Sequence, residues 1–331
     1  MTQGRKNIYK YLMVLAATCL VFSAGSFAAE GHFERTLQVT GPVDLTIRTG
    51  AGAIAVRTGG NSTVEIRGTI RAWDGLFSSG DAAKRVSYLE SHPPIEQQGN
   101  TIKIGTSSEP QMLHNVSISY DLVVPMNTRL SSNTGSGNQM VDGISGPMEA
   151  STGSGNIKAS NIGGSVQATT GSGQIVLEAV KEGVRVSTGS GNIQASGVSG
   201  SVRASTGSGE VTIEQTGAAD AWVSTGSGNI VLKSIRGLVQ ARTASGSITA
   251  EGGGQSPWHL ESVSGDVSVR VPQSVGFDLH AHTVSGSITT NRPLTVQGKI
   301  NNREITGKAG KGGFLLDIST VSGDIHIDWM A

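Results

Sequence analysis

The sequence predicts an all-β protein: a single-stranded parallel β-helix, or β-solenoid, with coils of about 18 residues and irregular N- and C-terminal caps. Three observations predict this fold. A Thr-Gly-Ser-Gly-x-Ile unit recurs at a nearly constant spacing. Apolar residues alternate within each repeat, as they do in half-buried strands. Gly supplies 47 of 331 residues while aromatic residues make up 4%, which favours a narrow repetitive core over a helical bundle.

Residues 1–28 predict a secretory signal peptide. A basic start over residues 5–10 precedes an apolar stretch over residues 11–22, and residues 26–28 fit a cleavage site that ends at Ala28. The apolar stretch is shorter than the roughly 20 residues that a membrane span needs. We therefore expect an exported protein that is periplasmic, cell-surface or secreted and has no transmembrane span after cleavage.

Charge and cysteine content narrow the class of partner. Cleavage would remove three basic and no acidic residues, which leaves 22 Lys and Arg (25 less 3) against 25 Asp and Glu. The mature chain then lacks the positive excess of a nucleic-acid binder, so we expect no nucleic acid partner. The only cysteine, Cys19, would leave with the signal. Lipidation of Cys19 and a retained signal anchor are less favoured alternatives.

Residues 29–130 predict an N-terminal β cap with one short helix. Irregular alternating stretches over residues 31–72 predict strands, and residues 81–90 predict an amphipathic helix. Two further strands are expected at 101–105 and 116–124. A cap is needed because an uncovered terminal coil would expose an unpaired sheet edge.

Residues 131–290 predict the regular solenoid coils. Apolar residues five and seven positions after each repeat threonine form one short strand, and an alternating pair before the next threonine forms a second. The threonine shares the inward parity of that pair, so we expect its hydroxyl to bond along the stack. Gly-Ser-Gly and a second turn supply the bends. The repeat threonines are Thr134, Thr152, Thr170, Thr188, Thr206, Thr225 and Thr243.

Residues 291–331 predict a C-terminal cap and a last coil. Residues 291–313 interrupt the period, and the repeat returns at Phe314 with Thr320 in the threonine position. Weaker copies of the repeat come earlier, with Ser262 and Thr283 in that position. Chain order predicts that these two coils are neighbours in the stack.

Four segments carry a family resemblance: VDLTIRTGAGAIAV, ISYDLVVPMNTRLSSNTGSGN, the STGSGNI coils and the final VSGDIHI coil. They resemble a bacterial family of unknown function named "putative adhesin", which is related to the head domains of auto-transporter adhesins. The resemblance covers nearly all of the mature chain. It implies a right-handed single-stranded β-helix at the cell envelope, and it implies no catalytic residues.

Four ligand-type side chains form a candidate metal site. If the last coils keep the register of the repeat, the strands around His259 and His280 are adjacent and these side chains point outward. His259 would then stack against His280, and Glu261 against His282. Imidazole and carboxylate groups at that spacing could hold Zn²⁺ or a similar ion. Ordinary exposed polar residues are the favoured alternative, and no cofactor is expected.

A column of outward residues at the same register predicts a binding face. It runs through Arg185, Arg203, Trp222 and Gln240. A tryptophan beside an arginine can form a cation–π pair or a platform on which a sugar stacks. The partners expected for such a face are an envelope polysaccharide or a surface protein, and plain surface is the favoured alternative.

Signatures of catalysis are absent from the sequence: it contains no GxSxG and no HExxH, and the mature chain has no thiol. The closest stacked carboxylates, Glu178 and Glu214, would lie two coils apart with Ser196 between them. The leading hypothesis is therefore a non-enzymatic, adhesin-like binding solenoid of the cell envelope or exterior. A structural or assembly spacer is the alternative, and a polysaccharide-active β-helix enzyme is a less favoured one.

Overall fold

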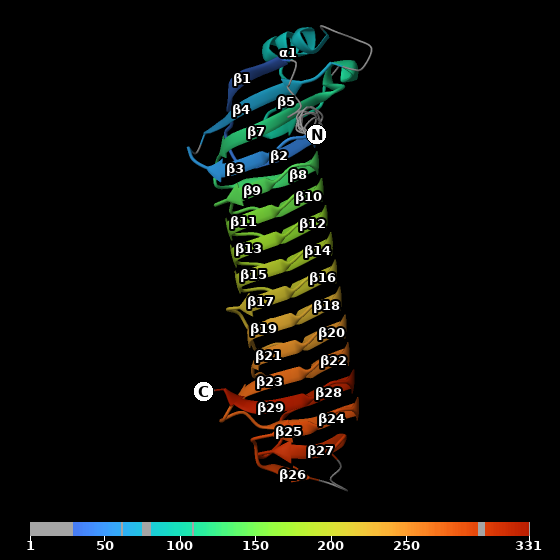
Figure 1. Cartoon of the computed structure of the whole chain (residues 1–331). Helices are drawn as coiled ribbons and strands as arrows, with labels where there is room; N and C mark the ends of the chain where they lie inside the picture. The colour runs from blue at the N-terminus through green and yellow to red at the C-terminus, as the bar shows by residue number, and fades with distance from the viewer. Residues whose placement is uncertain (1–28, 61, 75–80, 108, 297–301, 331) are drawn as a thin grey trace, which may run out of the picture.

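The computed structural model describes residues 29–60, 62–74, 81–107, 109–296 and 302–330. In these residues, two long sheets form an elongated rod (Figure 1). The predicted signal peptide, residues 1–28 with Cys19, lies outside the described residues, so export stays a prediction. The described part of the chain includes no helix that is long and apolar enough to cross a membrane.

Each regular coil contributes one strand to each of two sheets, which we call sheet A and sheet B. The predicted all-β solenoid with coils of about 18 residues is confirmed. In spatial order, sheet A consists of β1 (Ala29–Gln38), β4 (Thr63–Ala72), β7 (Val116–Val124), β3 (Ile54–Thr58), β9 (Gln139–Asp142), β11 (Ile157–Ile162), β13 (Ile175–Val180), β15 (Ile193–Val198), β17 (Val211–Gln215), β19 (Ile230–Ile235), β21 (Ile248–Gly252), β23 (Val267–Pro272), β29 (Ile325–Met330) and β25 (Ile288–Thr290).

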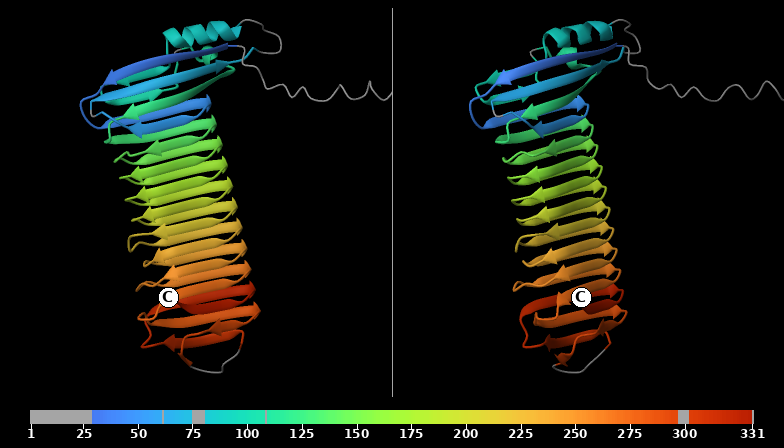
Figure 2. Two further views of the ribbon diagram at one scale, coloured as in Figure 1. Left: turned by 60° about the vertical axis from the view of Figure 1, so that its left-hand side comes forward. Right: turned by 90° about the vertical axis from the view of Figure 1, so that its left-hand side faces the viewer.

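Sheet B lies beside sheet A along the whole rod (Figure 2). Its regular strands pair in parallel and in register, so equivalent residues of successive coils form columns along the rod. In spatial order, sheet B consists of β26 (Leu294–Val296), β27 (Glu304–Ala309), β24 (Phe277–Ser285), β28 (Phe314–Ser322), β22 (Trp258–Ser264), β20 (Val239–Ser245), β18 (Ala221–Ser227), β16 (Val202–Ser208), β14 (Val184–Ser190), β12 (Val166–Ser172), β10 (Met148–Ser154), β8 (Thr128–Ser136), β2 (Val43–Ala51), β6 (Thr101–Ile104) and β5 (Ile95–Gln98).

The core lies between the two sheets and is filled by the alternating apolar residues of each strand. In β15, Ile193 and Ala195 are buried while Gln194 is exposed. Ile193 pairs with Ile175 on one neighbouring strand and with Val211 on the other, so the column stays apolar along the stack. The small and β-branched residues of this column keep the cross-section narrow, as predicted.

The first corner of each coil is built from the repeat threonine and the second glycine of Thr-Gly-Ser-Gly. Thr188 donates a hydrogen bond from Oγ1 to the carbonyl oxygen of Gly173 (3.1 Å), and Thr206 donates one to Gly191 (3.0 Å). A Cβ atom added to Gly191 would collide with the carbonyl oxygen of Gly173, so this position needs glycine. The predicted ladder of threonine hydroxyls is confirmed, with glycine carbonyls of the preceding coil as acceptors.

A second set of hydrogen bonds follows the corner glycine in several coils, and sequence reasoning missed it. Asn156 accepts from the backbone N–H of Gln174 through Oδ1 (2.8 Å), and Asn192 accepts in the same way from Glu210 (2.9 Å). Each amide thus satisfies a backbone donor one coil further along the stack. The recurring Asn after Gly-Ser-Gly was the available signal.

The opposite corner bends through a left-handed residue. Asn161, Ala179 and Ser234 have φ values of 57°, 55° and 59°, and Gly197 has 68°. These residues occupy equivalent positions, nine residues after their repeat threonines. The next residue of each coil, such as Val180, turns into the core. One residue with a positive φ therefore turns the chain from sheet A toward sheet B at this corner.

The N-terminal end closes the rod with antiparallel strands and a helix. β4 pairs with both β1 and β7 in antiparallel fashion, which removes the open parallel edge. The helix expected over residues 81–90 is α1 (Asp81–Ser91), and it buries Ala82, Val86 and Leu89. A short 3₁₀ helix, η1 (Pro110–Leu113), precedes β7.

The C-terminal end corrects the expected order of the coils. β28 pairs with β22 on one side and with β24 on the other, so the last coil of the chain lies between two coils that precede it in sequence (Figure 1). Trp258 and Phe277 each lie against the ring of Phe314, with centroids 5.6 and 6.0 Å away. Such aromatic pairs contribute about 0.5–1.5 kcal/mol each beyond the area they bury. The insertion thus joins three buried aromatic residues, an arrangement that the repeat period does not encode.

The outermost coil is covered by antiparallel strands and one buried arginine. β27 pairs with the free edge of β24, and β26 pairs with β27. The guanidinium of Arg292 lies between the rings of Phe277 and Trp329, 4.8 and 3.9 Å from their centroids. Its Nη2 donates to the carbonyl oxygen of Val275 (3.0 Å). This cation–π sandwich closes the end of the core.

Candidate binding surface

The predicted column lies on the outward face of sheet B. In the register of the sheet, Arg185 pairs with Arg203, Arg203 with Trp222, and Trp222 with Gln240. The side chains of Arg185, Arg203 and Gln240 are exposed and that of Trp222 is partly exposed. The expected adjacency of these four residues is therefore correct, because all the strands concerned follow the regular period.

Arg203 and Trp222 form the cation–π pair that the sequence suggested. The guanidinium carbon of Arg203 lies 4.3 Å from the centroid of the Trp222 ring. Such a pair contributes roughly 0.5–1 kcal/mol at an exposed site. The contact covers one face of the indole and fixes the guanidinium against a flat surface. Trp222 therefore acts first as a support for Arg203.

Two adjoining hollows run along this face, and Arg185 and Arg203 line both. The first extends toward β8 and reaches Arg129 and Glu149. The second extends toward β20 and reaches Trp222 and Arg242 as well. Serine hydroxyls lie between the charged residues in both hollows: Ser131, Ser165, Ser187, Ser201, Ser205 and Ser224. The face is thus a shallow polar trough that crosses the strands.

The charge on this trough is predominantly positive. Within the described part of the chain, Arg129, Arg185 and Arg203 have no carboxylate within ion-pair distance. Arg242 pairs with Glu261 on the next strand, from Nε to Oε2 at 3.2 Å. Asp44 on β2 is the register neighbour of Arg129. Arg185 and Arg203 therefore are the two guanidinium groups of this trough that face solvent with no acidic neighbour in register among the described residues.

The predicted metal patch is not assembled as expected. His259 and Glu261 lie on β22 and His280 and His282 lie on β24, but β28 separates these strands. Asp317 takes the position between the two histidines, and Ser319 takes the position between Glu261 and His282. The assumption that the patch required, direct pairing of the two strands, is wrong because the inserted coil intervenes.

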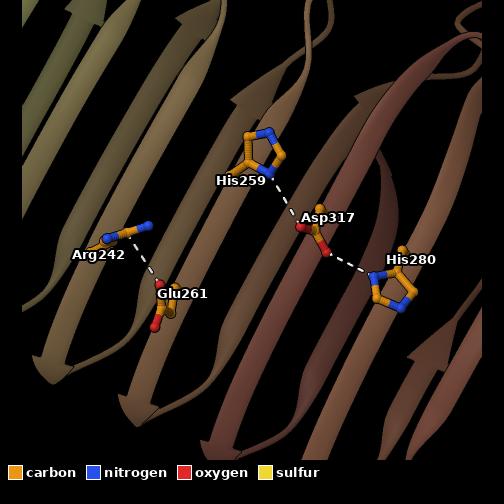
Figure 3. Close-up of polar contacts among 5 residues, drawn as sticks. All are labelled: Arg242, His259, Glu261, His280 and Asp317. Atoms are coloured by element: carbon orange, nitrogen blue, oxygen red, sulfur yellow. Dashed lines mark hydrogen bonds and ion pairs between the residues drawn. The ribbon is translucent and has the colours of Figure 1, made fainter.

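Asp317 instead joins the two histidines into a short polar chain (Figure 3). Its Oδ2 lies 3.2 Å from Nδ1 of His259, and its Oδ1 lies 3.0 Å from Nδ1 of His280. In the described residues, no group of three or more His, Cys, Asp or Glu side chains is placed to hold a metal ion. The signal for Asp317 was its position three residues before Thr320, which places it in the column of His259. The spatial order of the coils carried no such signal.

The carboxylates considered for catalysis lie on sheet A. Glu178 forms an ion pair with Lys158 (Oε1 to Nζ, 3.4 Å), and it is paired in register with Ser196 of the next strand. Glu214 lies beside Lys233 in register. Each carboxylate therefore has a cation nearby rather than a second carboxylate.

Shifted pKa values occur where side chains hold the stack together. Hydrogen bonds from Ser160 and Asn161 lower the pKa of the Asp142 carboxyl. Burial raises the pKa of Tyr120 and lowers that of Arg292. Perturbed groups often mark functional sites, but these three serve the corner, the N-terminal end and the C-terminal end of the rod.

The fold defines a class of protein: a β-solenoid in which every coil gives one strand to each of two sheets. Residues 165–328, just under half of the chain, match the family model described as Toastrack DUF4097. This match supports the predicted resemblance to a family of unknown function. The relation to auto-transporter head domains and the handedness implied by it stay predictions.

Three solved structures are similar over most of the chain. A putative cell adhesion protein from Clostridium sporogenes is 13% identical, with 91% of this chain and 100% of that chain covered and a TM-score of 0.26. A putative adhesin from Bacteroides fragilis is 14% identical, with coverage of 92% and 99% and a TM-score of 0.29. A putative lipid binding protein from Parabacteroides distasonis is 12% identical, with coverage of 91% and 97% and a TM-score of 0.38. The chain matches none of the curated proteins.

Proposed function

We propose that this protein is a non-enzymatic binding solenoid of the cell envelope or cell exterior, which presents the outward face of sheet B to a surface polymer or protein. One observation carries the proposal. Arg185, Arg203 and Trp222 form a continuous column along two adjoining hollows, and the two arginines have no counterion among the described residues. Polar groups that the protein leaves unpaired at a concave surface are available to a ligand.

The rigidity of the sheet supports this function. Each side chain in the column is carried by a strand that is hydrogen-bonded on both sides, so the spacing between neighbouring side chains is fixed at about 4.8 Å. A preorganised surface spends little conformational entropy when a ligand binds. An extended ligand that runs along the rod can therefore contact side chains of several successive coils at once.

The arrangement of the ionisable groups favours binding over catalysis. Glycoside hydrolysis uses two carboxylates that flank one bond. Glu178 is paired with Lys158, and Asp317 is held between His259 and His280. Neither of these carboxylates has a second carboxylate as its partner, so neither forms the pair that flanks a glycosidic bond.

Binding assays against envelope and cell-surface fractions, together with hydrolysis assays on polysaccharides, test this proposal. We expect binding without turnover. Arg203→Ala or Trp222→Ala should weaken binding about tenfold, as expected for central contact residues. Gln194→Ala, on the outward face of sheet A, is the matched control and should change binding little. Turnover of any polysaccharide, or equal effects of the variant and control, would contradict the proposal.

An assembly or spacer module is the second candidate, and a row of exposed valines favours it. Val263, Val321 and Val284 follow the repeat threonine position on β22, β28 and β24, and their exposed fractions are 48%, 49% and 53%. Glycine or alanine occupies this corner position in the regular coils. Self-association that Val284→Ser and Val321→Ser abolish, without any ligand binding, would favour this candidate.

A further inference from the structure

We propose that the ligand of the sheet B face is an anionic polysaccharide, whose carboxylate, sulfate or phosphate groups are bound by an arginine row. Arg185 and Arg203 form its centre, and Arg129 and Arg242, which have Asp44 and Glu261 as neighbours, lie at its two ends. This inference rests on the proposed function, and it adds the chemical class of the polymer. The argument depends on four features of the face: its uncompensated charge, the support of Arg203, its hydroxyl groups and its length.

The uncompensated charge is the first feature. Arg185 and Arg203 are direct neighbours on β14 and β16, and both side chains are exposed. Like charges opposite each other on paired strands destabilise a sheet. Several other strand arginines have carboxylate partners, for example Arg67 with Glu34 (3.1 Å) and Arg270 with Glu251 (2.6 Å). A bound anion would supply the partner that the described residues do not give to Arg185 and Arg203.

The support of Arg203 is the second feature. The indole of Trp222 lies against the guanidinium, 4.3 Å from ring centroid to guanidinium carbon, and holds it flat. Arg203 has no hydrogen-bond acceptor among the described residues, so the N–H groups at the edge of its guanidinium can meet a ligand. A planar guanidinium with a free edge binds the two oxygens of a carboxylate, sulfate or phosphate in bidentate fashion. The cation–π contact therefore positions the group for an anion.

The hydroxyl groups are the third feature, and they distinguish a glycan from other polyanions. Ser187 and Ser205 lie beside the two arginines, and their hydroxyls are 3.2 Å apart. Hydroxyls both donate and accept hydrogen bonds, so they suit a ligand that carries hydroxyls between its charged groups. Single-stranded nucleic acid is bound by several aromatic side chains that stack on successive bases. This column has one tryptophan, and Arg203 covers a face of it.

The composition of the face also argues against a membrane surface. Membrane-interface binding requires a large apolar area beside the basic residues. Among the described residues, the large exposed apolar side chains lie outside the outward face of sheet B between β8 and β20: Trp73, Met126, Met140, Val263, Val284, Leu315, Val321 and Met330. The arginine row is flanked by serine and glutamine instead.

The length of the row is the fourth feature. Arg129 on β8 and Arg242 on β20 are separated by six strand-to-strand steps. At about 4.8 Å per step, the row spans about 29 Å along the rod. Arg129 and Arg242 lie two residues to opposite sides of the Arg185–Arg203 column, so the row crosses the strands obliquely. A short anion can meet one or two of these groups, whereas a chain that follows the oblique row can meet more of them. We therefore expect affinity to rise steeply with the length of the polymer.

Binding of chemically matched polymers tests the inference. Polygalacturonate is compared by calorimetry with its carboxyl-reduced, neutral form, and a sulfated glycan and inorganic polyphosphate form two further arms. We expect the uronate or the sulfated glycan to bind with an affinity that falls as salt is raised. The neutral polymer should bind at least about tenfold more weakly. Polyphosphate lacks hydroxyls and should bind more weakly than the best glycan.

A charge-matched pair of variants locates the site. Arg185→Gln with Arg203→Gln should weaken glycan binding at least about tenfold, whereas Lys158→Gln with Lys233→Gln removes the same charge from sheet A and should change binding within about twofold. Without ligand and at low salt, the arginine variant should melt cooperatively at a temperature close to that of the unmodified protein, because the removal of a like-charge contact offsets the loss of the cation–π pair. This second measurement shows that the variant is folded.

The outcomes separate the two proposals. Equal binding of the neutral and charged glycans overturns the anionic ligand and leaves the binding function in place. Polyphosphate or single-stranded DNA binding more tightly than every glycan overturns the glycan class. If neither polymer nor envelope protein binds, both the anionic ligand and the proposed function are wrong.

Discussion

At the scale of single residues, the repeat threonine and the second glycine act as a pair. The threonine hydroxyl needs an acceptor inside the corner, and the glycine carbonyl of the preceding coil provides it, as Gly191 does for Thr206. The carbonyl oxygen of Gly191 also occupies the space that a Cβ on Gly209, the second glycine of the next coil, would need. The first glycine of the motif is less restricted, since Ala244, Val263, Val284 and Val321 occupy its position in four coils. The threonine of the motif is thus explained by its hydrogen bond, and the second glycine by the close approach of the preceding coil's carbonyl group.

Thr206→Val tests how much the hydrogen bond from Thr206 to Gly191 contributes to the free energy of unfolding. Valine keeps the shape of the side chain but leaves the carbonyl of Gly191 without its donor in a buried corner. The free energy of unfolding should fall by about 1–2 kcal/mol, the usual cost of an unsatisfied buried group. Urea denaturation measures it. Ser208→Ala, two residues further along and exposed, is the control, and an equal loss there would show that the ladder contributes nothing specific.

At the scale of the elements, the sequence predicted the strands of each repeat but not the spatial order of the last three coils. The strands, the buried columns, the helix over residues 81–90 and the adjacency of Arg203 with Trp222 follow from local alternation and a fixed period. The position of β28 does not, because β22 can pair in register with either β24 or β28. The choice depends on contacts between distant residues, such as Phe314 against Trp258 and Phe277. Asp317 was missed for the same reason.

Asp324 tests how the inserted coil is held. Its Oδ1 accepts from the backbone N–H (2.8 Å) and the hydroxyl (2.9 Å) of Ser287 in the outermost coil, and these bonds lower the pKa of the Asp324 carboxyl. A carboxyl whose pKa is lower in the folded protein adds stability above its unfolded pKa and loses it as the pH falls through the folded pKa.

Asp324→Asn should therefore lower the melting temperature at neutral pH. The difference from the unmodified protein should disappear in acid, once Asp324 itself is protonated. Thermal melts across pH 7 to 2 measure it, and Glu182→Gln, at an exposed site in a regular coil, gives the background. A difference that stays constant down to the lowest pH would show that the charge of Asp324 does not contribute.

At the scale of the whole molecule, the rod is a sum of equivalent coils, each of which contacts its neighbours in the same register. Stability in such a protein depends on nearest-neighbour contacts. Regular coils could then be added or removed without a change in the contacts between the remaining coils, as long as both end structures are kept.

Removal of one complete coil tests this equivalence. Deletion of residues 189–206 joins Thr188 to Gly207, so the motif and both columns continue without a shift in register. We expect a folded, cooperatively melting protein of somewhat lower stability, observed by circular dichroism. Deletion of residues 189–197 removes half a coil and exchanges the positions of the two strands, so it should abolish the cooperative melt. A folded half-coil deletion would contradict the fixed register.

The inserted coil also affects the order in which the strands can pair during synthesis. Residues made earlier can stack one coil at a time, but the strand that pairs with β22 is β28, which follows β24 in the chain. Until it arrives, β22 has a free edge that β24 can occupy in the register that chain order suggests, with His259 against His280. The last coil must then displace β24 by one strand position. We therefore expect the pairing seen in the structure to form only after residues 314–330 have been synthesised, and we expect a chain cut before Phe314 to keep β24 beside β22.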